Sequence, residues 1–187
     1  GGEGGTGAAP AEFLDHVGAP LRQGLVLTRN ALVGTGLKDD VRLACSGKQI
    51  SAFSIAASMA LGADWVNTAR GFMFSLGCIQ SLNCHNNTCP TGIATTDKTR
   101  QRGLVVEEKA IRVRNFQRNT VQALMEVVGA TGCVHPSELT PRHVMHRVTE
   151  DIAYTAERAY QLVQPGQLLT APDETQLARE WRMAQAH

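Results

Sequence analysis

The stretch VRLACSGKQISAFSIAASMALGADWVNTARG, residues 41–71, decides the fold class of this chain. It opens with a short apolar run over 41–45 that predicts a buried strand ending in a polar turn. Ser51 is a suitable N-cap for a helix of small and apolar residues over 53–61. After a turn at 62–64, the segment WVNTA over 65–69 predicts a second strand. Strand, tight loop, helix and strand is the βαβ pattern of a parallel sheet, so we predict an α/β fold.

Helices are predicted on both sides of this βαβ unit. Upstream, Pro10 opens a short helix over 11–16, and Pro20 is suited to the first turn of a helix over 20–34. Downstream, regularly spaced apolar residues predict one long helix over 107–128. The segment between the unit and the long helix has little periodicity, which is typical of a long functional loop.

Residues 130–187 form a predicted C-terminal extension. Shorter helices are expected over 137–147 and 150–163, and an exposed helix is expected over 170–187. The predicted organisation is therefore a sheet-containing part over 1–129, followed by a helical extension.

Charge, hydropathy and cysteine usage narrow the function classes. The 18 Lys and Arg residues nearly balance the 17 Asp and Glu residues, for a net charge of +1, which provides no electrostatic reason to expect nucleic acid or an anionic membrane as partner. No apolar run reaches the roughly 18 residues of a membrane span. The chain has five cysteines, an odd number, and three of them lie within twelve residues, which is not typical of a disulfide framework. A reduced, cytoplasmic setting is expected.

The strongest chemical signal is a group of three cysteines in the loop 78–93. Cys78, Cys84 and Cys89 are separated by five and then four residues. Three thiolates on one loop can converge on a metal centre, because thiolate is the soft ligand that iron–sulfur clusters and zinc prefer. An iron–sulfur cluster is favoured. A zinc site with His85 as fourth ligand, and cysteines that bind no metal, stay open as alternatives.

Two short turns indicate a phosphate site. Ser46-Gly47-Lys48 and Ala69-Arg70-Gly71 each follow a predicted strand and each combine glycine with a cation. In a (β/α)8 barrel, loops after neighbouring strands near the end of the barrel commonly bind phosphate through glycine amides, helix amino ends and a cation. Taken alone, a Gly-Lys turn is more often only a turn.

The opening sequence GGEGGTG, residues 1–7, carries Gly2, Gly4 and Gly7 in the register of a dinucleotide-binding fingerprint. That fingerprint requires a preceding strand, which the sequence does not contain, and an acidic residue about twenty residues on, where the sequence has Leu27. A loop kept thin so that a flat ligand can lie against it is the favoured interpretation.

Basic side chains gather early in the predicted long helix. We expect them to make one basic helix face beside the cysteine loop, either solvated or able to receive an acidic redox partner. These residues are Lys109, Arg112, Arg114 and Arg118.

Together, GGEGGTGAAP, the SGK turn, LGADWVNTARGFMFSLGCIQ and above all CIQSLNCHNNTCPTGIATTD resemble the FMN-binding synthase domain of glutamate synthase. The resemblance is closest to the shorter stand-alone bacterial members of that family, and it runs from residue 1 to about 129. It implies a TIM barrel that carries FMN, with a 3Fe-4S cluster held by Cys78, Cys84 and Cys89.

The reaction that the resemblance implies is reductive amination of 2-oxoglutarate to L-glutamate. Ammonia, free or derived from glutamine, condenses with 2-oxoglutarate, and reduced FMN delivers hydride to the resulting 2-iminoglutarate. Electrons arrive through the cluster from ferredoxin or from a reductase that uses a nicotinamide cofactor. The flavin supplies the redox chemistry and the protein supplies position and electrostatics.

Carried onto this sequence, the resemblance implies site residues in three loops. The loop 1–7 lies near flavin and substrate, with Glu3 and Thr6 at the substrate. Val41–Ala44 and Trp65–Ala69 correspond to barrel strands seven and eight. The implied cofactor-binding residues are Gly4, Gly5, Ser46, Gly47, Lys48, Ala69, Arg70 and Gly71. No residue of this chain is assigned a catalytic role.

The sequence departs from the family pattern in what it lacks. A complete (β/α)8 barrel takes about 250 residues, whereas this chain has 187, starts without Met inside the glycine motif, and shows two barrel strands. The family's amidotransferase domain is also missing. We therefore expect the C-terminal portion of a (β/α)8 barrel that binds FMN poorly and has little activity by itself. The alternatives are a metal-stabilised structural or interaction module, and an FMN and iron–sulfur barrel oxidoreductase with a different substrate.

Overall fold

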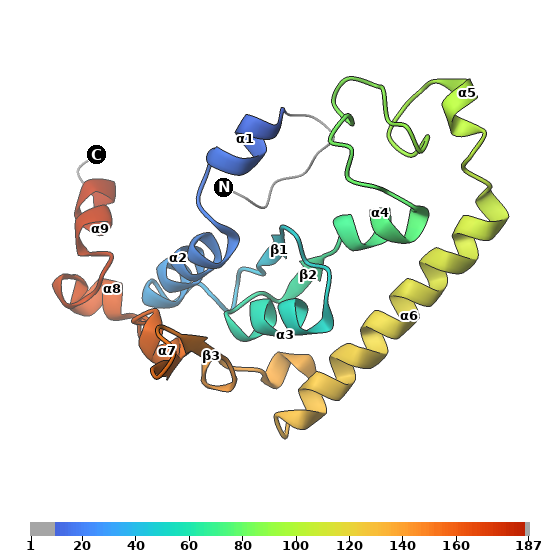
Figure 1. Cartoon of the computed structure of the whole chain (residues 1–187). Coiled ribbons are helices and arrows are strands. Elements are labelled where there is room, and N and C mark those ends of the chain that lie inside the picture. Colours follow the sequence, from blue (N-terminus) through green and yellow to red (C-terminus); the bar gives the residue numbers. More distant parts are fainter. Residues whose placement is uncertain (1–9, 186–187) are drawn as a thin grey trace.

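A computed structural model of the chain describes residues 10–185 and shows a mixed α/β arrangement of helices around two small sheets (Figure 1). The strands are β1 (Ala44–Ser46), β2 (Trp65–Asn67), β3 (Met145–Arg147) and β4 (Ala153–Thr155). The α-helices are α1 (Ala11–His16), α2 (Leu21–Gly34), α3 (Ala52–Ala60), α4 (Arg70–Leu76), α5 (Lys98–Gln101), α6 (Val106–Ala130), α7 (Ala156–Ala159), α8 (Gln167–Thr170) and α9 (Ala178–Gln185). Three 3₁₀ turns are η1 (Pro136–Glu138), η2 (Pro141–His143) and η3 (Pro172–Glu174).

The predicted βαβ unit is confirmed. β1 and β2 pair in parallel, with Ala44 opposite Trp65 and Ser46 opposite Asn67, and α3 connects them. The helix begins as predicted, because Ser51 forms a capping box at its first turn. Both strands are shorter than predicted.

The first strand starts later than predicted because the backbone of Leu43 has other partners. Its N–H donates to the carboxylate of Asp64 at 2.6 Å, and its carbonyl accepts from the N–H groups of Asp64 at 2.8 Å and Trp65 at 3.3 Å. The carboxylate of Asp64 also accepts from Lys38 Nζ at 2.9 and 3.1 Å and from Arg42 at 3.3 Å. Asp64 therefore ties the entrances of β1 and β2 together.

This network makes stability depend on pH through Asp64. Burial raises the pKa of its carboxyl, but the hydrogen bond from the Leu43 backbone and the contacts with Lys38 and Arg42 outweigh burial and lower it. A lowered folded-state pKa contributes stability above the unfolded value of about 3.9, and that stability is lost as pH falls through the folded value. In urea unfolding of the chain, Asp64→Asn should lose about 2 kcal/mol at pH 7 and should flatten the loss of stability below about pH 4.

The matched control for Asp64→Asn is Asp173→Asn. Asp173 pairs with Arg182 at 3.1 Å, but both side chains are largely exposed, and such a pair contributes about 0–1 kcal/mol. Equal unfolding free energies for the two variants at pH 7 would contradict the role of Asp64.

Two groups of apolar residues form the core around the βαβ unit. One joins α2, β1 and the end of α3 to the distant Ala156, which is fully buried. The other joins α3 to the end of α6 through Ala56, Ala60 and Val128. Small side chains on α3 allow α6 to approach closely. No helix within residues 10–185 is both long and apolar enough to cross a membrane.

The helices predicted over 137–147 and 150–163 are wrong. These segments form η1 and η2, an antiparallel hairpin of β3 and β4, and the single turn of α7. Pro141 lies inside the helix predicted over 137–147, where it lacks the N–H that a helix interior uses, so short 3₁₀ turns form there instead. The hairpin closes where Ile152 N–H donates to Thr149 Oγ1 at 3.1 Å. The extension is therefore a mixture of helix and strand.

The extension packs back onto α2, which links the two ends of the described chain (Figure 1). Val163 N–H donates to the buried Asn30 side chain at 3.3 Å, and Gly166 N–H donates to the carbonyl of Val33 at 3.0 Å. A Cβ at Gly34 would lie 2.5 Å from the side chain of Leu168. Glycine at this position is therefore required for the close approach of α8 to α2.

Candidate functional site

The two predicted phosphate turns leave the sheet at the same edge. Ser46 and Asn67 are register partners at the last positions of β1 and β2. Gly47 and Lys48 follow directly on one strand, and 68–71 follow on the other. The structure thus brings these segments together, as expected for successive loops of a parallel sheet.

The first turn has an unusual backbone. Gly47 has a φ of 143° and Lys48 a φ of 45°, and this left-handed region is uncommon for a residue with a side chain. Successive N–H groups in turns of this kind form concave surfaces that bind anions. The helix α3, which begins four residues later at Ala52, adds its positive amino end nearby. The turn is suited to a phosphate group.

The second turn leads into α4, whose first residue is Arg70. A Cβ at Gly71 would lie 2.5 Å from the ring of Phe116 and 3.0 Å from the methyl group of Thr68. Phe116 also stacks edge-on against Phe72, with ring centroids 5.1 Å apart. Packing of α4 against α6 therefore requires glycine at position 71, in addition to the phosphate role that we predict for it.

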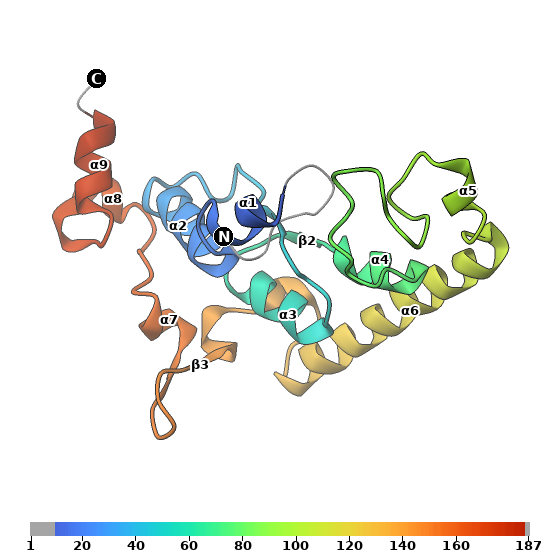
Figure 2. The same cartoon turned by 45° about the horizontal axis from the view of Figure 1, so that its top comes forward.

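The helix α4 connects the second turn to the cysteine loop (Figure 2). It ends at Gly77, whose φ of 106° forms a left-handed C-cap, and Cys78 N–H closes the cap on the carbonyl of Met73 at 2.9 Å. Seven residues of helix cover about 10 Å. The first cysteine is therefore held at a short, fixed distance from the phosphate turn.

The surroundings of Cys89 favour the thiolate form of its side chain. Its side chain is 5% exposed, and Sγ lies 3.4 Å from the hydroxyl of Thr91. Burial raises the pKa of this thiol, but hydrogen bonds from the Thr91 side chain and from the backbone N–H groups of Ala94, Thr91 and Ile93 outweigh burial and lower it to about 7. This donor set would stabilise an anionic sulfur ligand.

The other two cysteines are half-buried, and all five cysteines of the chain are free thiols. Gln80 N–H donates to Cys78 Sγ at 3.4 Å. Between residues 10 and 185, no three histidine, cysteine or carboxylate side chains lie close enough to hold one metal ion. Neither the three thiols nor the alternative set with His85 is gathered in this structure. Three thiols are suitable ligands for an iron–sulfur cluster, but in this structure they do not lie close enough together to bind one.

Asn87 organises the cysteine loop and was missed by the sequence analysis. Its side-chain oxygen accepts from Thr96 N–H at 2.7 Å and from Thr96 Oγ1 at 3.2 Å. Its own carbonyl accepts from Thr95 Oγ1 at 2.8 Å. Asn87 has a φ of 65°, a conformation in which asparagine is enriched. Its position within a run of polar residues was the signal that could have identified it.

The prediction of one basic face on α6 is wrong. Lys109 and Arg112 lie over the C-terminus of α4, where a Cβ at Gly77 would be 3.5 Å from Lys109 Nζ and 3.9 Å from Arg112. This placement suits cations, because the carboxyl end of a helix is negative. At 100° per residue, Arg114 and Arg118 project from roughly the opposite side of the helix. The four basic residues therefore lie on two opposite faces of α6.

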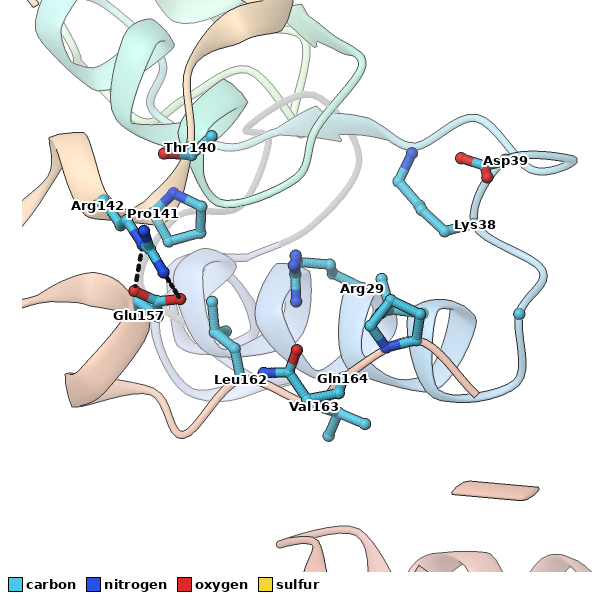
Figure 3. A pocket seen from close by; sticks show the side chains of 13 residues that line it. Arg29, Lys38, Asp39, Thr140, Pro141, Arg142, Glu157, Leu162, Val163 and Gln164 are labelled. Atoms are coloured by element: carbon cyan, nitrogen blue, oxygen red, sulfur yellow. Dashed lines mark hydrogen bonds and ion pairs between the residues drawn. The ribbon is translucent and has the colours of Figure 1, made fainter. Parts of the chain in front are cut away.

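A separate cavity of about 540 Å³ lies between α2 and the extension (Figure 3). Arg29 and Lys38 line one side, and Arg142 and Glu157 form a bidentate ion pair at 2.8 and 3.4 Å on the other. The cavity is on the side where the chain enters β1. Among residues 10–185, none of those predicted to bind cofactor or metal lines it.

Four predicted residues, Glu3, Gly4, Gly5 and Thr6, lie outside the described residues. The geometry of the glycine loop with respect to the two turns therefore remains a prediction.

The fold and the loops together define a mixed α/β domain in which two glycine-containing turns leave one sheet edge and a three-cysteine loop follows α4. Residues 1–134 match the family model described as the conserved region in glutamate synthase. The chain belongs to the glutamate synthase family.

Individual relatives agree with this assignment. The chain is 44% identical over 147 residues to the glutamate synthase large subunit-like protein YerD of Bacillus subtilis, which covers 79% of this chain and 28% of that protein. It is 34% identical over 130 residues to the archaeal glutamate synthase (NADPH) of Methanocaldococcus jannaschii, covering 70% of this chain and 26% of the relative. It is 37% identical over 93 residues to ferredoxin-dependent glutamate synthase 2 of Arabidopsis thaliana, covering 50% of this chain and 6% of the relative. The chain thus spans little more than a quarter of the first two relatives.

Proposed function

We propose that residues 1–187 contribute the C-terminal part of an FMN and iron–sulfur barrel that makes L-glutamate from 2-oxoglutarate. The observation that carries this proposal is the arrangement of loops in a member of the glutamate synthase family. Two phosphate-type turns leave one sheet edge, and α4 joins the second turn to the cysteine loop. A flavin site and a cluster site would thus be neighbours.

The flavin phosphate would be held between the two turns. Gly47 and Lys48 would offer N–H groups and an ammonium group, and Arg70 at the amino end of α4 would offer a second cation. Residues of the glycine loop would lie against the flavin ring and the substrate. The proposed cofactor residues are Gly4, Gly5, Ser46, Gly47, Lys48, Ala69, Arg70 and Gly71, with Glu3 and Thr6 at the substrate.

The 3Fe-4S cluster would be held by Cys78, Cys84 and Cys89. Cys89 brings a thiol whose pKa is lowered to about 7, and Cys78 is fixed at the end of α4. Because the three thiols are not gathered in this structure, we propose that the loop 78–93 closes when the cluster is inserted. Folding of a ligand loop around its metal is common.

The overall reaction would consume 2-oxoglutarate, ammonia, two electrons and two protons, and would yield L-glutamate and water. Bound flavin would supply the hydride chemistry. The names of the relatives include both an NADPH type and a ferredoxin-dependent type, so either a nicotinamide-dependent reductase or ferredoxin is proposed as electron donor. Ammonia would arrive free or from glutamine. A reducing, cytoplasmic setting is proposed from the odd count of five cysteines.

The chain by itself is proposed to bind FMN weakly and to have little activity. Within residues 10–185 its parallel sheet has two strands, whereas a closed barrel has eight. On the outer side of α6, Ile111, Val121 and Met125 are 56%, 46% and 43% exposed, and Phe53 on α3 is 61% exposed. The remaining strands and helices of a barrel would cover such surfaces.

The proposal is tested on the complete open reading frame that encodes this chain, expressed and purified without oxygen. We expect bound FMN, about three irons with four acid-labile sulfides, and glutamate formed from 2-oxoglutarate and ammonia with a reduced donor. Zinc without flavin absorbance would instead support a metal-stabilised structural or interaction module. A fully reducible flavin that forms no glutamate would indicate a related oxidoreductase with another substrate.

A further inference from the structure

A chain of buried polar groups lies beneath the turn that follows β1. Gln49 is 7% exposed and Ser58, on the inner face of α3, is 3% exposed. Gln49 Nε2 donates to the carbonyl of Gly47 at 3.0 Å, and Ser58 Oγ donates to Gln49 Oε1 at 3.1 Å. Burying a carboxamide without partners would cost free energy, so each of its ends is satisfied by a specific group. The side chain of Gln49 is thereby fixed between the helix and the turn.

The hydrogen bond from Gln49 orients the peptide group between Gly47 and Lys48. All described peptide bonds are trans, so the carbonyl of Gly47 and the N–H of Lys48 point in opposite directions. With the carbonyl drawn toward the buried carboxamide, the N–H of Lys48 is directed away from it. Lys48 is exposed whereas Gln49 is buried, and the proposed phosphate would lie on the exposed side of the turn.

The same bond supports a strained backbone. Lys48 has a φ of 45°, and the left-handed conformation costs a residue with a side chain about 1–2 kcal/mol. Such a conformation persists only where its surroundings hold it. Gln49 contacts this turn from the buried side, and Ser58 donates a hydrogen bond to Gln49.

We propose that Gln49 is a positioning residue that holds the backbone of the turn in the conformation that binds a phosphate group. This inference rests on the proposed function. The site would then select flavin that carries a phosphate over flavin that lacks it. A residue that merely filled space would contribute equally to the binding of both, because the two flavins share the same ring and differ only at the phosphate.

The experiment compares FMN with riboflavin, using the apoprotein of the complete open reading frame. Gln49→Met preserves the length of the side chain but donates no hydrogen bond, and Ser58→Ala releases the far end of Gln49 without removing it. Gln122→Met is the matched control, because Gln122 is an exposed glutamine of α6 that donates to Glu126. Dissociation constants for both flavins are measured by quenching of flavin fluorescence, with thermal unfolding of each apoprotein recorded alongside.

We expect Gln49→Met to weaken FMN binding about tenfold while riboflavin binding changes less than about twofold, since one hydrogen bond that orders a charged contact is worth about 1.4 kcal/mol. Ser58→Ala should show a smaller loss in the same direction, and Gln122→Met none. Unchanged selectivity in both Gln49→Met and Ser58→Ala, or equal losses for the two flavins, would overturn the inference alone. Lack of any preference for FMN in the unaltered protein would overturn the proposed flavin site as well.

Discussion

Gly92→Ala should disorder the cysteine loop and remove most of the iron from the protein. A Cβ at Gly92 would run into the carbonyl oxygen of Arg100, and it would lie 2.8 Å from the Arg100 carbonyl carbon and 3.0 Å from Gln101 Cα. Backbone cannot swing aside as a flexible side chain can, and the φ of 76° at Gly92 adds strain for any larger residue. The penalty is about 3 kcal/mol, or a hundredfold in the equilibrium that orders the loop.

Gly103→Ala is the control for this effect. Gly103 lies close by in sequence, but a Cβ there would meet only the Arg100 oxygen at 3.9 Å, which is ordinary contact. Iron content and acid-labile sulfide are measured for both variants of the complete open reading frame, with amide hydrogen exchange over the loop as a second readout. Retention of iron and of slow exchange in Gly92→Ala would contradict the packing of this loop against α5.

The second large effect is expected from Cys89→Ser. A serine hydroxyl does not ionise near neutral pH and is a harder ligand than thiolate, so the cluster should be lost and the visible absorbance of the iron–sulfur centre with it. The hydrogen bonds from Thr91, Ile93 and Ala94 would be left without their anionic acceptor. FMN should remain bound, because the phosphate turns lie at the other end of α4.

Cys133→Ser serves as the control for Cys89→Ser. Cys133 is a half-buried free thiol that follows α6 and lies outside the loop 78–93. We expect its replacement to leave iron, sulfide and absorbance unchanged within experimental error. A full complement of iron in Cys89→Ser, or an equal loss in Cys133→Ser, would contradict the assignment of Cys89 as a cluster ligand.

Local sequence signals predicted the elements that depend on local interactions. The capping box at Ser51 and the prolines before α1 and α2 mark helix starts that the structure confirms. The long helix over 107–128 was predicted from spacing and observed as α6. Caps, prolines and periodicity act within a few residues, which is why they can be recognised without the fold.

Elements that depend on distant partners were predicted less well. Leu43 was placed in a strand, but its backbone is bonded by Asp64 across the sheet entrance. The hairpin of β3 and β4 was predicted as helix, because its strands are three residues long and carry no extended alternating pattern. Whether so short a segment forms a strand depends on the segment with which it can pair.

The candidate site likewise has features that the sequence predicts and features that depend on tertiary contacts. The sequence by itself determined the family, the three thiols and the two glycine turns, because these depend on residue types at fixed spacing. Only the tertiary structure decided that both turns leave one sheet edge, that Gln49 holds the Gly47 carbonyl, and that backbone N–H groups surround Cys89. The physical reason is that orientation and burial arise from contacts between segments, and a hydrogen bond that a buried side chain donates to a turn carbonyl produces no periodic pattern in the sequence.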